Sequence, residues 1–156
     1  MPYYFAYGSN MNPARMAQRG LAVVDAMPGK LQNMALRFNK RSRHNAQWAC
    51  ANVGWSPGQV VEGVLYRLAD EQQIELMDPF EGTPRYYSRE RFPVHTDQGV
   101  IPGWVYVANP ANIGEDVLPL RWYLNQLLEG KPFLSGEYFR WLCQVQCHEA
   151  DAEGWG

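Results

Sequence analysis

Short strand-like segments separated by turn residues dominate this chain, and they restrict its fold more than any other feature. Six segments are apolar or alternating and bounded by glycine, proline or polar turns, at residues 2–7, 22–39, 48–55, 60–68, 86–96 and 99–109. Most of them precede the two longest helix-like segments, and a regular alternation of strand and helix is missing. We therefore predict an α+β fold with a mostly antiparallel sheet that can curl into a barrel, rather than a doubly wound parallel sheet.

Two of these boundaries depend on short turn motifs. Pro28-Gly29 is a turn dipeptide, so we expect two strands within residues 22–39. The polar stretch 56–59, Ser-Pro-Gly-Gln, is expected to be the turn that ends one strand and begins the next.

Capping residues predict the helices. Asn12 is a suitable N-cap before Pro13, and Gly20 closes a short first helix. A second helix begins at Asp70, carries Ile74 and Met77 on its inner face, and is predicted to end at Pro79. The last two helices are expected at residues 119–129 and 135–147.

Composition places the chain in a broad class. It has 156 residues, of which 46% are hydrophobic and 13% aromatic, enough for a single domain over residues 1–156. Residues 149–156 are predicted to be a flexible tail. The net charge is −2, which argues against a nucleic-acid-binding surface, and the most basic stretch, residues 37–45, is interpreted as a solvated loop.

Location follows from segments that the sequence lacks. No apolar run approaches the roughly 18 residues that cross a bilayer, so no membrane association is predicted. No charged and then apolar leader is recognisable at the N-terminus. The three cysteines cannot all pair within one chain. We therefore expect a cytoplasmic protein with reduced thiols.

The segment Tyr7-Gly8-Ser9-Asn10 is the first candidate site. A strand that breaks at glycine and leads into a helix leaves backbone N–H groups without partners, and these can bind a carboxylate or an oxyanion. Taken alone, the segment is better explained as an ordinary strand-to-helix turn. It lacks the Lys-Ser/Thr of a phosphate-binding loop.

Glu81 is the second candidate. It follows the predicted helix end, precedes Gly82, and has aromatic neighbours in Phe80, Tyr86 and Tyr87. Burial among them would raise its pKa toward that of a general acid or base. By itself, a solvated turn glutamate is the simpler interpretation.

The third candidate is a metal or thiol site near the C-terminus. Cys143 and Cys147 are four residues apart and would share a face of the last helix. No paired His or Cys elsewhere completes a zinc site, and no base is indicated for a nucleophilic cysteine. We predict no metal and no cofactor.

Taken together, four segments resemble the gamma-glutamylcyclotransferase-like (AIG2-like) family. They are residues 3–11, 56–68, 76–94 and, more weakly, 118–142. The resemblance implies a small mixed, mostly antiparallel β-barrel flanked by helices, with no metal or organic cofactor. It implies that Glu81 is the catalytic acid/base. It also implies that Tyr7, Gly8, Ser9, Asn10, Tyr87 and Tyr123 bind substrate.

The resemblance further implies a reaction. The α-amine of a γ-glutamyl amine or γ-glutamyl amino acid attacks its own side-chain carbonyl and yields 5-oxoproline plus a free amine. No protein nucleophile is then required, which agrees with the absence of one here. The alternatives are a non-catalytic domain that keeps the pocket and binds a small metabolite, and a different lyase or amide-cleaving activity in the same cavity. We expect specificity to reside in residues 40–47 and 107–116. The oligomeric state is left open.

Overall fold

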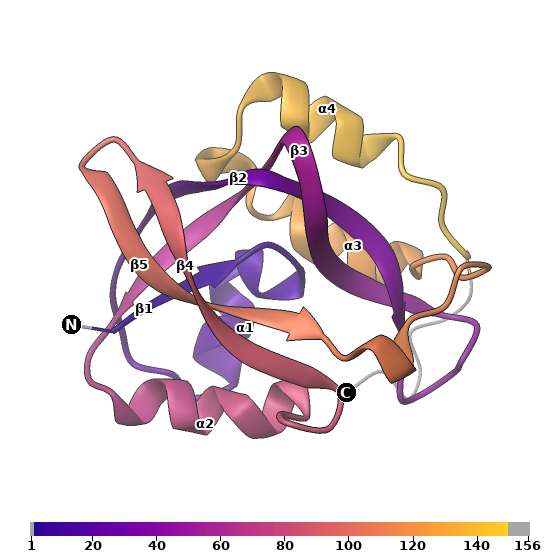
Figure 1. Cartoon of the computed structure of the whole chain (residues 1–156), viewed down its shortest axis with the longest axis horizontal. Coiled ribbons are helices and arrows are strands. Elements are labelled where there is room, and N and C mark those ends of the chain that lie inside the picture. The colour runs from indigo at the N-terminus through magenta and orange to yellow at the C-terminus, as the bar shows by residue number, and fades with distance from the viewer. Residues whose placement is uncertain (1, 150–156) are drawn as a thin grey trace.

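A computed structural model describes residues 2–149, and it contains a closed five-stranded barrel (Figure 1). Around the barrel the strands follow the order β1-β3-β2-β4-β5. Their bounds are β1 Tyr3–Ala6, β2 Val23–Arg41, β3 Ala49–Leu68, β4 Tyr87–Thr96 and β5 Gly99–Ala108. All neighbours are antiparallel except β1 and β5, whose parallel contact closes the barrel. The predicted fold class is confirmed.

The long strand β2 contradicts the turn predicted at Pro28-Gly29. Both residues lie within the strand, where Pro28 pairs with Val64 and Gly29 with Gly63 of β3. A strand tolerates proline at a position where the backbone nitrogen does not have to donate a hydrogen bond to a neighbouring strand. The dipeptide therefore does not reverse the chain, because pairing with β3 holds it extended on both sides.

Strand β3 is likewise continuous through the predicted turn at residues 56–59. The register passes from Gln32↔Val60 to Met34↔Trp55, so this stretch forms an irregularity within the pair. The side-chain oxygen of Asn33 accepts from the backbone N–H of Gly58 at 3.0 Å. The predicted turn is therefore wrong, because the stretch forms a bulge within one strand and does not end it.

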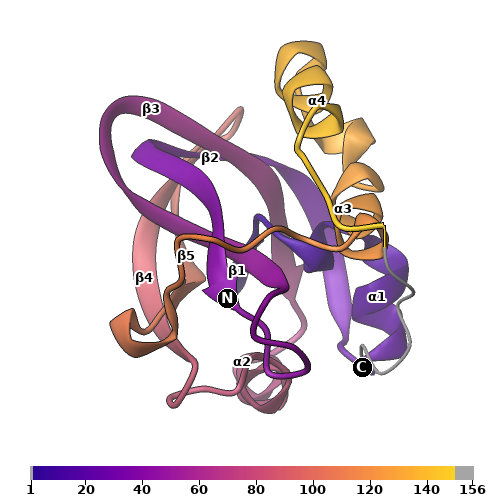
Figure 2. The ribbon, with the colours of Figure 1, turned by 90° about the vertical axis from the view of Figure 1, so that its right-hand side faces the viewer.

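Four α-helices cover the barrel: α1 Pro13–Gln18, α2 Gln72–Glu81, α3 Arg121–Leu128 and α4 Gly136–Cys143. Helices α1, α3 and α4 lie along one side of it, and α2 lies below it in Figure 2. Asn12 caps α1 as predicted, because its side chain accepts from the N–H of Ala14. No helix of the described residues is long and apolar enough to cross a membrane.

Helix α2 does not end at Pro79. Proline lies inside its last turn, and the helix continues to Glu81, where Gly82 adopts the left-handed conformation with φ of 65°. Ile74 and Met77 are buried, as predicted. Glu81 is consequently the last residue of a helix and not part of a turn.

The C-terminal prediction also changes. Helix α4 ends at Cys143, so Cys147 does not share its face. The chain continues to His148, whose N–H donates to Pro119 and whose carbonyl accepts from Arg121. Of the tail predicted at 149–156, only Glu149 is described, and its carboxylate pairs with Arg121 at 3.0 Å; residues 150–156 lie outside the described part.

Candidate functional site

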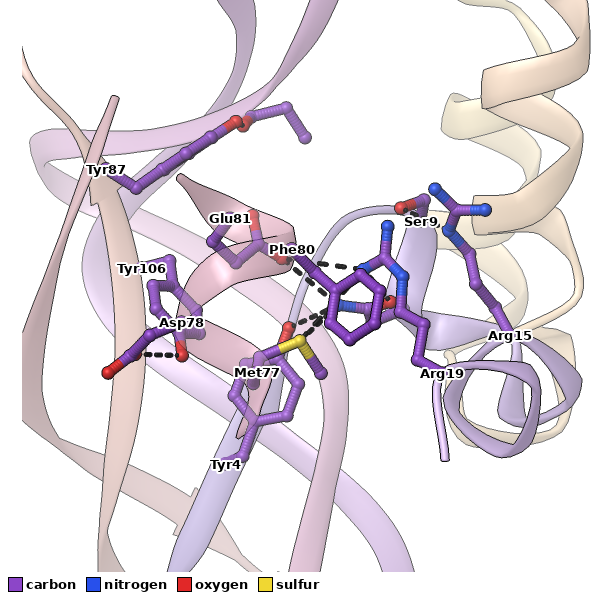
Figure 3. Close-up of polar contacts among 12 residues, drawn as sticks. Tyr4, Ser9, Arg15, Arg19, Met77, Asp78, Phe80, Glu81, Tyr87 and Tyr106 are labelled. Atoms are coloured by element: carbon purple, nitrogen blue, oxygen red, sulfur yellow. Dashed lines mark hydrogen bonds and ion pairs between the residues drawn. The ribbon is translucent and has the colours of Figure 1, made fainter. Parts of the chain in front are cut away.

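The carboxylate of Glu81 lies where the end of α2 meets the segment after β1 (Figure 3). Its Oε1 accepts from Nδ2 of Asn10 at 3.1 Å and lies 3.9 Å from Nη1 of Arg19. The side chain is 18% exposed. The structure thus brings together the two strongest sequence candidates, which are 71 residues apart in the chain.

Asn10 is buried at the centre of this contact. Its Nδ2 also donates to the hydroxyl of Tyr4 at 2.9 Å, its Oδ1 accepts from Arg19 at 2.9 Å, and its backbone carbonyl accepts from Tyr66 at 2.7 Å. These bonds fix the orientation of its amide, which in turn aligns the carboxylate of Glu81.

The segment from Gly8 to Asn10 leads into a single 3-10 turn, Ser9–Met11. In that turn Met11 donates to Gly8 and Asn12 donates to Ser9. The N–H groups of Ser9 and Asn10 have no acceptor within the turn, as the start of any helix requires. A Cβ at residue 8 would lie 3.1 Å from the hydroxyl oxygen of Tyr123, so glycine at this position allows the backbone to pass close to Tyr123.

Tyrosines form one wall of the site. The hydroxyl of Tyr87 donates to the carbonyl of Ala51 at 2.7 Å, and the hydroxyl of Tyr123 accepts from the N–H of Ala51 at 2.9 Å. The hydroxyl of Tyr7 donates to the carbonyl of Tyr106. The hydroxyl protons of Tyr7 and Tyr87 are already donated to backbone oxygens. Toward a ligand, these two side chains therefore present the faces of their rings and hydroxyl oxygens that can accept a hydrogen bond.

Basic side chains form the other wall. Arg15 of α1 donates from Nε to Ser9 Oγ at 3.1 Å, and Arg19, directly after the end of α1, reaches Asn10 and Glu81 (Figure 3). Arg43 stacks over the ring of Tyr86. Sequence reasoning did not assign Arg15 or Arg19 to the site, whereas Arg43 lies in the segment 40–47 that was expected to determine specificity.

Lys40 contradicts the interpretation of residues 37–45 as a solvated loop. It is the penultimate residue of β2 and only 3% exposed, and its ammonium lies 5.1 Å and 5.2 Å from the ring centroids of Tyr86 and Tyr87. Ser42 is buried as well. The basic stretch is thus partly inside the protein, because the barrel carries Lys40 of β2 next to the rings of Tyr86 and Tyr87.

Two adjoining cavities open between these walls. The inner cavity is lined by tyrosines and the 7–10 segment: Tyr4, Tyr7, Gly8, Ser9, Asn10, Ala51, Glu81, Tyr87, Tyr106 and Tyr123. The outer cavity is lined mainly by basic and polar groups: Ser9, Arg15, Arg19, Lys40, Ser42, Arg43, His44, Cys50, Phe80, Glu81, Tyr87 and Tyr123. Glu81 is one of four residues that line both, so it lies at their junction.

Burial controls the charge states in the site. It raises the pKa of the Glu81 carboxyl above its ordinary value of 4.5, and the nearby cations, Arg19 first among them, oppose that rise. Burial also raises the pKa of the Cys50 thiol to about 12, so this cysteine stays protonated and is a poor nucleophile at neutral pH. Within residues 2–149 no three His, Cys, Asp or Glu side chains are arranged to share a metal ion.

This arrangement agrees with comparisons to known proteins. The family model described as "Gamma-glutamyl cyclotransferase, AIG2-like" matches residues 4–125. The chain belongs to this family. The match to the mouse protein named gamma-glutamylcyclotransferase is 34% identical over 82 residues, and it covers 51% of this chain but only 43% of the mouse protein.

Two solved structures extend the likeness to nearly the whole chain. A structure named gamma-glutamyl cyclotransferase superposes with a TM-score of 0.81 at 25% identity, over 96% of this chain and 90% of the other. An uncharacterised human protein gives a TM-score of 0.81 at 26% identity over the same shares. The likeness extends beyond the matched sequence segments and includes the helices that flank the barrel.

Sequence reasoning nominated seven site residues: Tyr7, Gly8, Ser9, Asn10, Glu81, Tyr87 and Tyr123. All seven line the inner cavity. Of the two segments expected to determine specificity, the first supplies Lys40, Ser42, Arg43 and His44 to the outer cavity. The second, residues 107–116, does not line it, but the N–H of Gly114 donates to the carbonyl of Asn39 next to Lys40.

Proposed function

We propose that this protein is a γ-glutamyl cyclotransferase that converts a γ-glutamyl amine or γ-glutamyl amino acid to 5-oxoproline and a free amine. The observation that carries the proposal is the carboxylate of Glu81, held 3.1 Å from the Asn10 amide and facing the cavity formed by the Tyr7–Asn10 segment. Membership of the family and the likeness of fold support the general activity.

The reaction needs one base that later acts as an acid. Ionised Glu81 takes a proton from the substrate α-ammonium, and the resulting amine attacks the γ-carbonyl carbon to form the ring C–N bond. Protonated Glu81 then gives a proton to the amide nitrogen, and the bond to the leaving amine breaks. The ring nitrogen loses one further proton as the lactam forms, and the released amine takes one up at neutral pH. A raised pKa suits a group that performs both transfers.

The remaining site residues position the substrate. Folding the γ-glutamyl chain so that its amine faces its own carbonyl is a proximity effect that a narrow cavity provides. N–H groups of Ser9 and Asn10 are available for the α-carboxylate or for the developing oxyanion. The rings of Tyr7, Tyr87 and Tyr123 enclose the chain and exclude water.

Glu81→Gln tests the proposal, because the amide keeps the size of the side chain but cannot exchange protons. We expect release of 5-oxoproline, measured by mass spectrometry on a panel of γ-glutamyl compounds, to fall about 100- to 10,000-fold. Glu75→Gln is the matched control, since Glu75 is exposed on the same helix. Undiminished turnover in Glu81→Gln contradicts the mechanism, and a wild-type protein that releases no 5-oxoproline from any member of the panel contradicts the activity.

A further inference from the structure

The cation of Lys40 is buried without an anion. Among residues 2–149 its side chain makes no ion pair within 4 Å and no hydrogen bond. Its ammonium lies beside the rings of Tyr86 and Tyr87, and Cys50, Arg43 and Glu81 are near enough to act on its charge. Removing an ammonium from water is costly unless an opposite charge or acceptors replace the water. A buried cation that lines a cavity is therefore suited to a negatively charged group of a ligand.

The other buried cations of the site already have acceptors. Arg19 is bonded to Asn10 and lies beside Glu81, and Arg15 is bonded to Ser9. These two arginines act on the 7–10 segment and on the carboxylate. Lys40, in contrast, has no bonded acceptor among the described residues, so it can bind the ligand directly.

The position of Lys40 indicates which part of the ligand it meets. It lines the outer cavity and not the inner one, whereas Glu81 lines both. In the proposed reaction Glu81 serves both the attacking and the leaving nitrogen, so it lies between the two halves of the substrate. The cyclising half then occupies the inner cavity, and the leaving amine occupies the outer cavity with Lys40.

The backbone holds Lys40 in place before any ligand arrives. The β2–β3 register is irregular between Phe38 and Lys40, and such irregularities redirect side chains near functional sites. Lys40 also forms an isolated bridge with Ile113, beside the bond from Gly114 to Asn39. Because the backbone of Lys40 is held on both sides, binding has to order only its side chain, which favours affinity.

We propose that Lys40 determines specificity by binding a carboxylate on the leaving half of the substrate, so that γ-glutamyl amino acids are preferred to γ-glutamyl amines without that group. This inference rests on the proposed function. It assigns Lys40 to recognition and not to proton transfer.

Two substrates that differ only in the relevant group provide the test. γ-Glutamyl-alanine and γ-glutamyl-ethylamide are identical except that a carboxylate in the first is a hydrogen in the second. For the wild-type protein we expect kcat/KM for 5-oxoproline release to be about 10- to 100-fold higher with γ-glutamyl-alanine, the range of one charge-assisted hydrogen bond. Lys40→Met should abolish most of this preference by slowing the alanine compound alone.

Controls keep the test decisive. Lys30→Met, at an exposed lysine of the same strand, should retain the wild-type preference. If Lys40→Met does not fold, Lys40→Gln provides a polar neutral replacement. Equal slowing of both substrates by Lys40→Met would place Lys40 on the γ-glutamyl half and overturn the inference, as would a wild-type protein without preference. Failure of the wild-type protein to release 5-oxoproline from either compound overturns the proposed function itself.

Discussion

The two walls of the site differ in how their polar groups are satisfied. On the tyrosine wall, the hydroxyls of Tyr7, Tyr87 and Tyr123 are bonded to backbone groups of Tyr106 and Ala51. On the basic wall, the Lys40 ammonium lies beside the rings of Tyr86 and Tyr87 and has no hydrogen-bond acceptor among the described residues. The hydroxyls of the first wall have partners without a ligand, whereas Lys40 on the second wall has no bonded acceptor among the described residues. We infer from this difference that the tyrosines shape the cavity and that Lys40 recognises what enters it.

Asn10→Asp should disturb the boundary between the two walls most. The new carboxylate would stand about 3.1 Å from that of Glu81, and two acids so close cannot both ionise readily, so the pKa of the pair rises. We expect kcat/KM at pH 7 to fall about 100-fold, which corresponds to about 2.7 kcal/mol. Asn125→Asp, at an exposed position on α3, is the control, and an unchanged rate in Asn10→Asp would contradict the role given to the amide.

Arg19→Met should have a smaller, pH-dependent effect. Arg19 is the largest of the charges that oppose the raised pKa of Glu81. Without Arg19 the pKa of Glu81 rises further, so the acidic limb of the kcat/KM profile should move to higher pH, by about one unit. At a pH below that limb the loss would be about tenfold, and above it the loss should fade. Arg37→Met, at an exposed position on β2, should leave the limb in place.

Tyr87→Phe tests whether the tyrosine wall is mainly structural. The change removes the bond to the Ala51 carbonyl and leaves a buried acceptor unpaired, so the free energy of unfolding should fall by about 1 to 3 kcal/mol. Activity of the folded fraction should change far less than in Asn10→Asp. Tyr3→Phe is the control, because its hydroxyl has no hydrogen bond in the described part of the chain. A large loss of activity without a loss of stability would instead give the Tyr87 hydroxyl a direct role.

A smaller predicted effect is a gain of stability when the charge of Glu81 is removed. In the folded protein the pKa of Glu81 is raised, so between pH 4.5 and that raised pKa the folded state holds a proton that the unfolded state has lost. Stability therefore falls as pH rises through this interval and stays reduced above it. Glu81→Gln should flatten this dependence in denaturant titrations and be more stable at pH 8, by about 1 kcal/mol. A steeper dependence in the variant would contradict the direction of the shift.

Lys40→Met should show the same trend for a different charge. Burial lowers the pKa of Lys40, so its positive charge is less favourable in the folded protein than in the unfolded chain. A methionine of similar length removes that cost and should leave the protein as stable as the wild type or slightly more stable. Loss of substrate preference together with retained stability would separate recognition from folding. A marked destabilisation would mean that the contacts with Tyr86 and Tyr87 stabilise the charge.

Local patterns and family motifs of the sequence were together sufficient for the barrel and for half of the site. Short apolar segments with turns between them predicted a mostly antiparallel sheet, the family resemblance predicted that it forms a mixed barrel, and the cap at Asn12 predicted the start of α1. The family motifs identified Glu81 and the 7–10 segment, which the structure brings within hydrogen-bonding distance. Such features depend on neighbours in sequence, so they can be recognised without the fold.

Other features depended on partners that are distant in the chain. Pro28-Gly29 and residues 56–59 are turn motifs, but pairing between β2 and β3 holds them in long strands. Pro79 is a helix breaker by propensity, yet α2 passes through it. In the two strands, pairing outweighed a local preference of one or a few residues, because a preference of that size is small beside a whole ladder of hydrogen bonds. In α2 the helix continues past Pro79 to Glu81, and Gly82 ends it.

Lys40 shows most clearly what each level decides. The sequence by itself determined that a basic stretch follows a strand and that Glu81 stands near aromatic residues. Only the closed barrel decided that Lys40 lies beneath Tyr86 and Tyr87 while Arg41, its neighbour, is exposed. The physical reason is that alternate residues of a strand point to opposite faces, and which face becomes the cavity depends on strands far away in the chain.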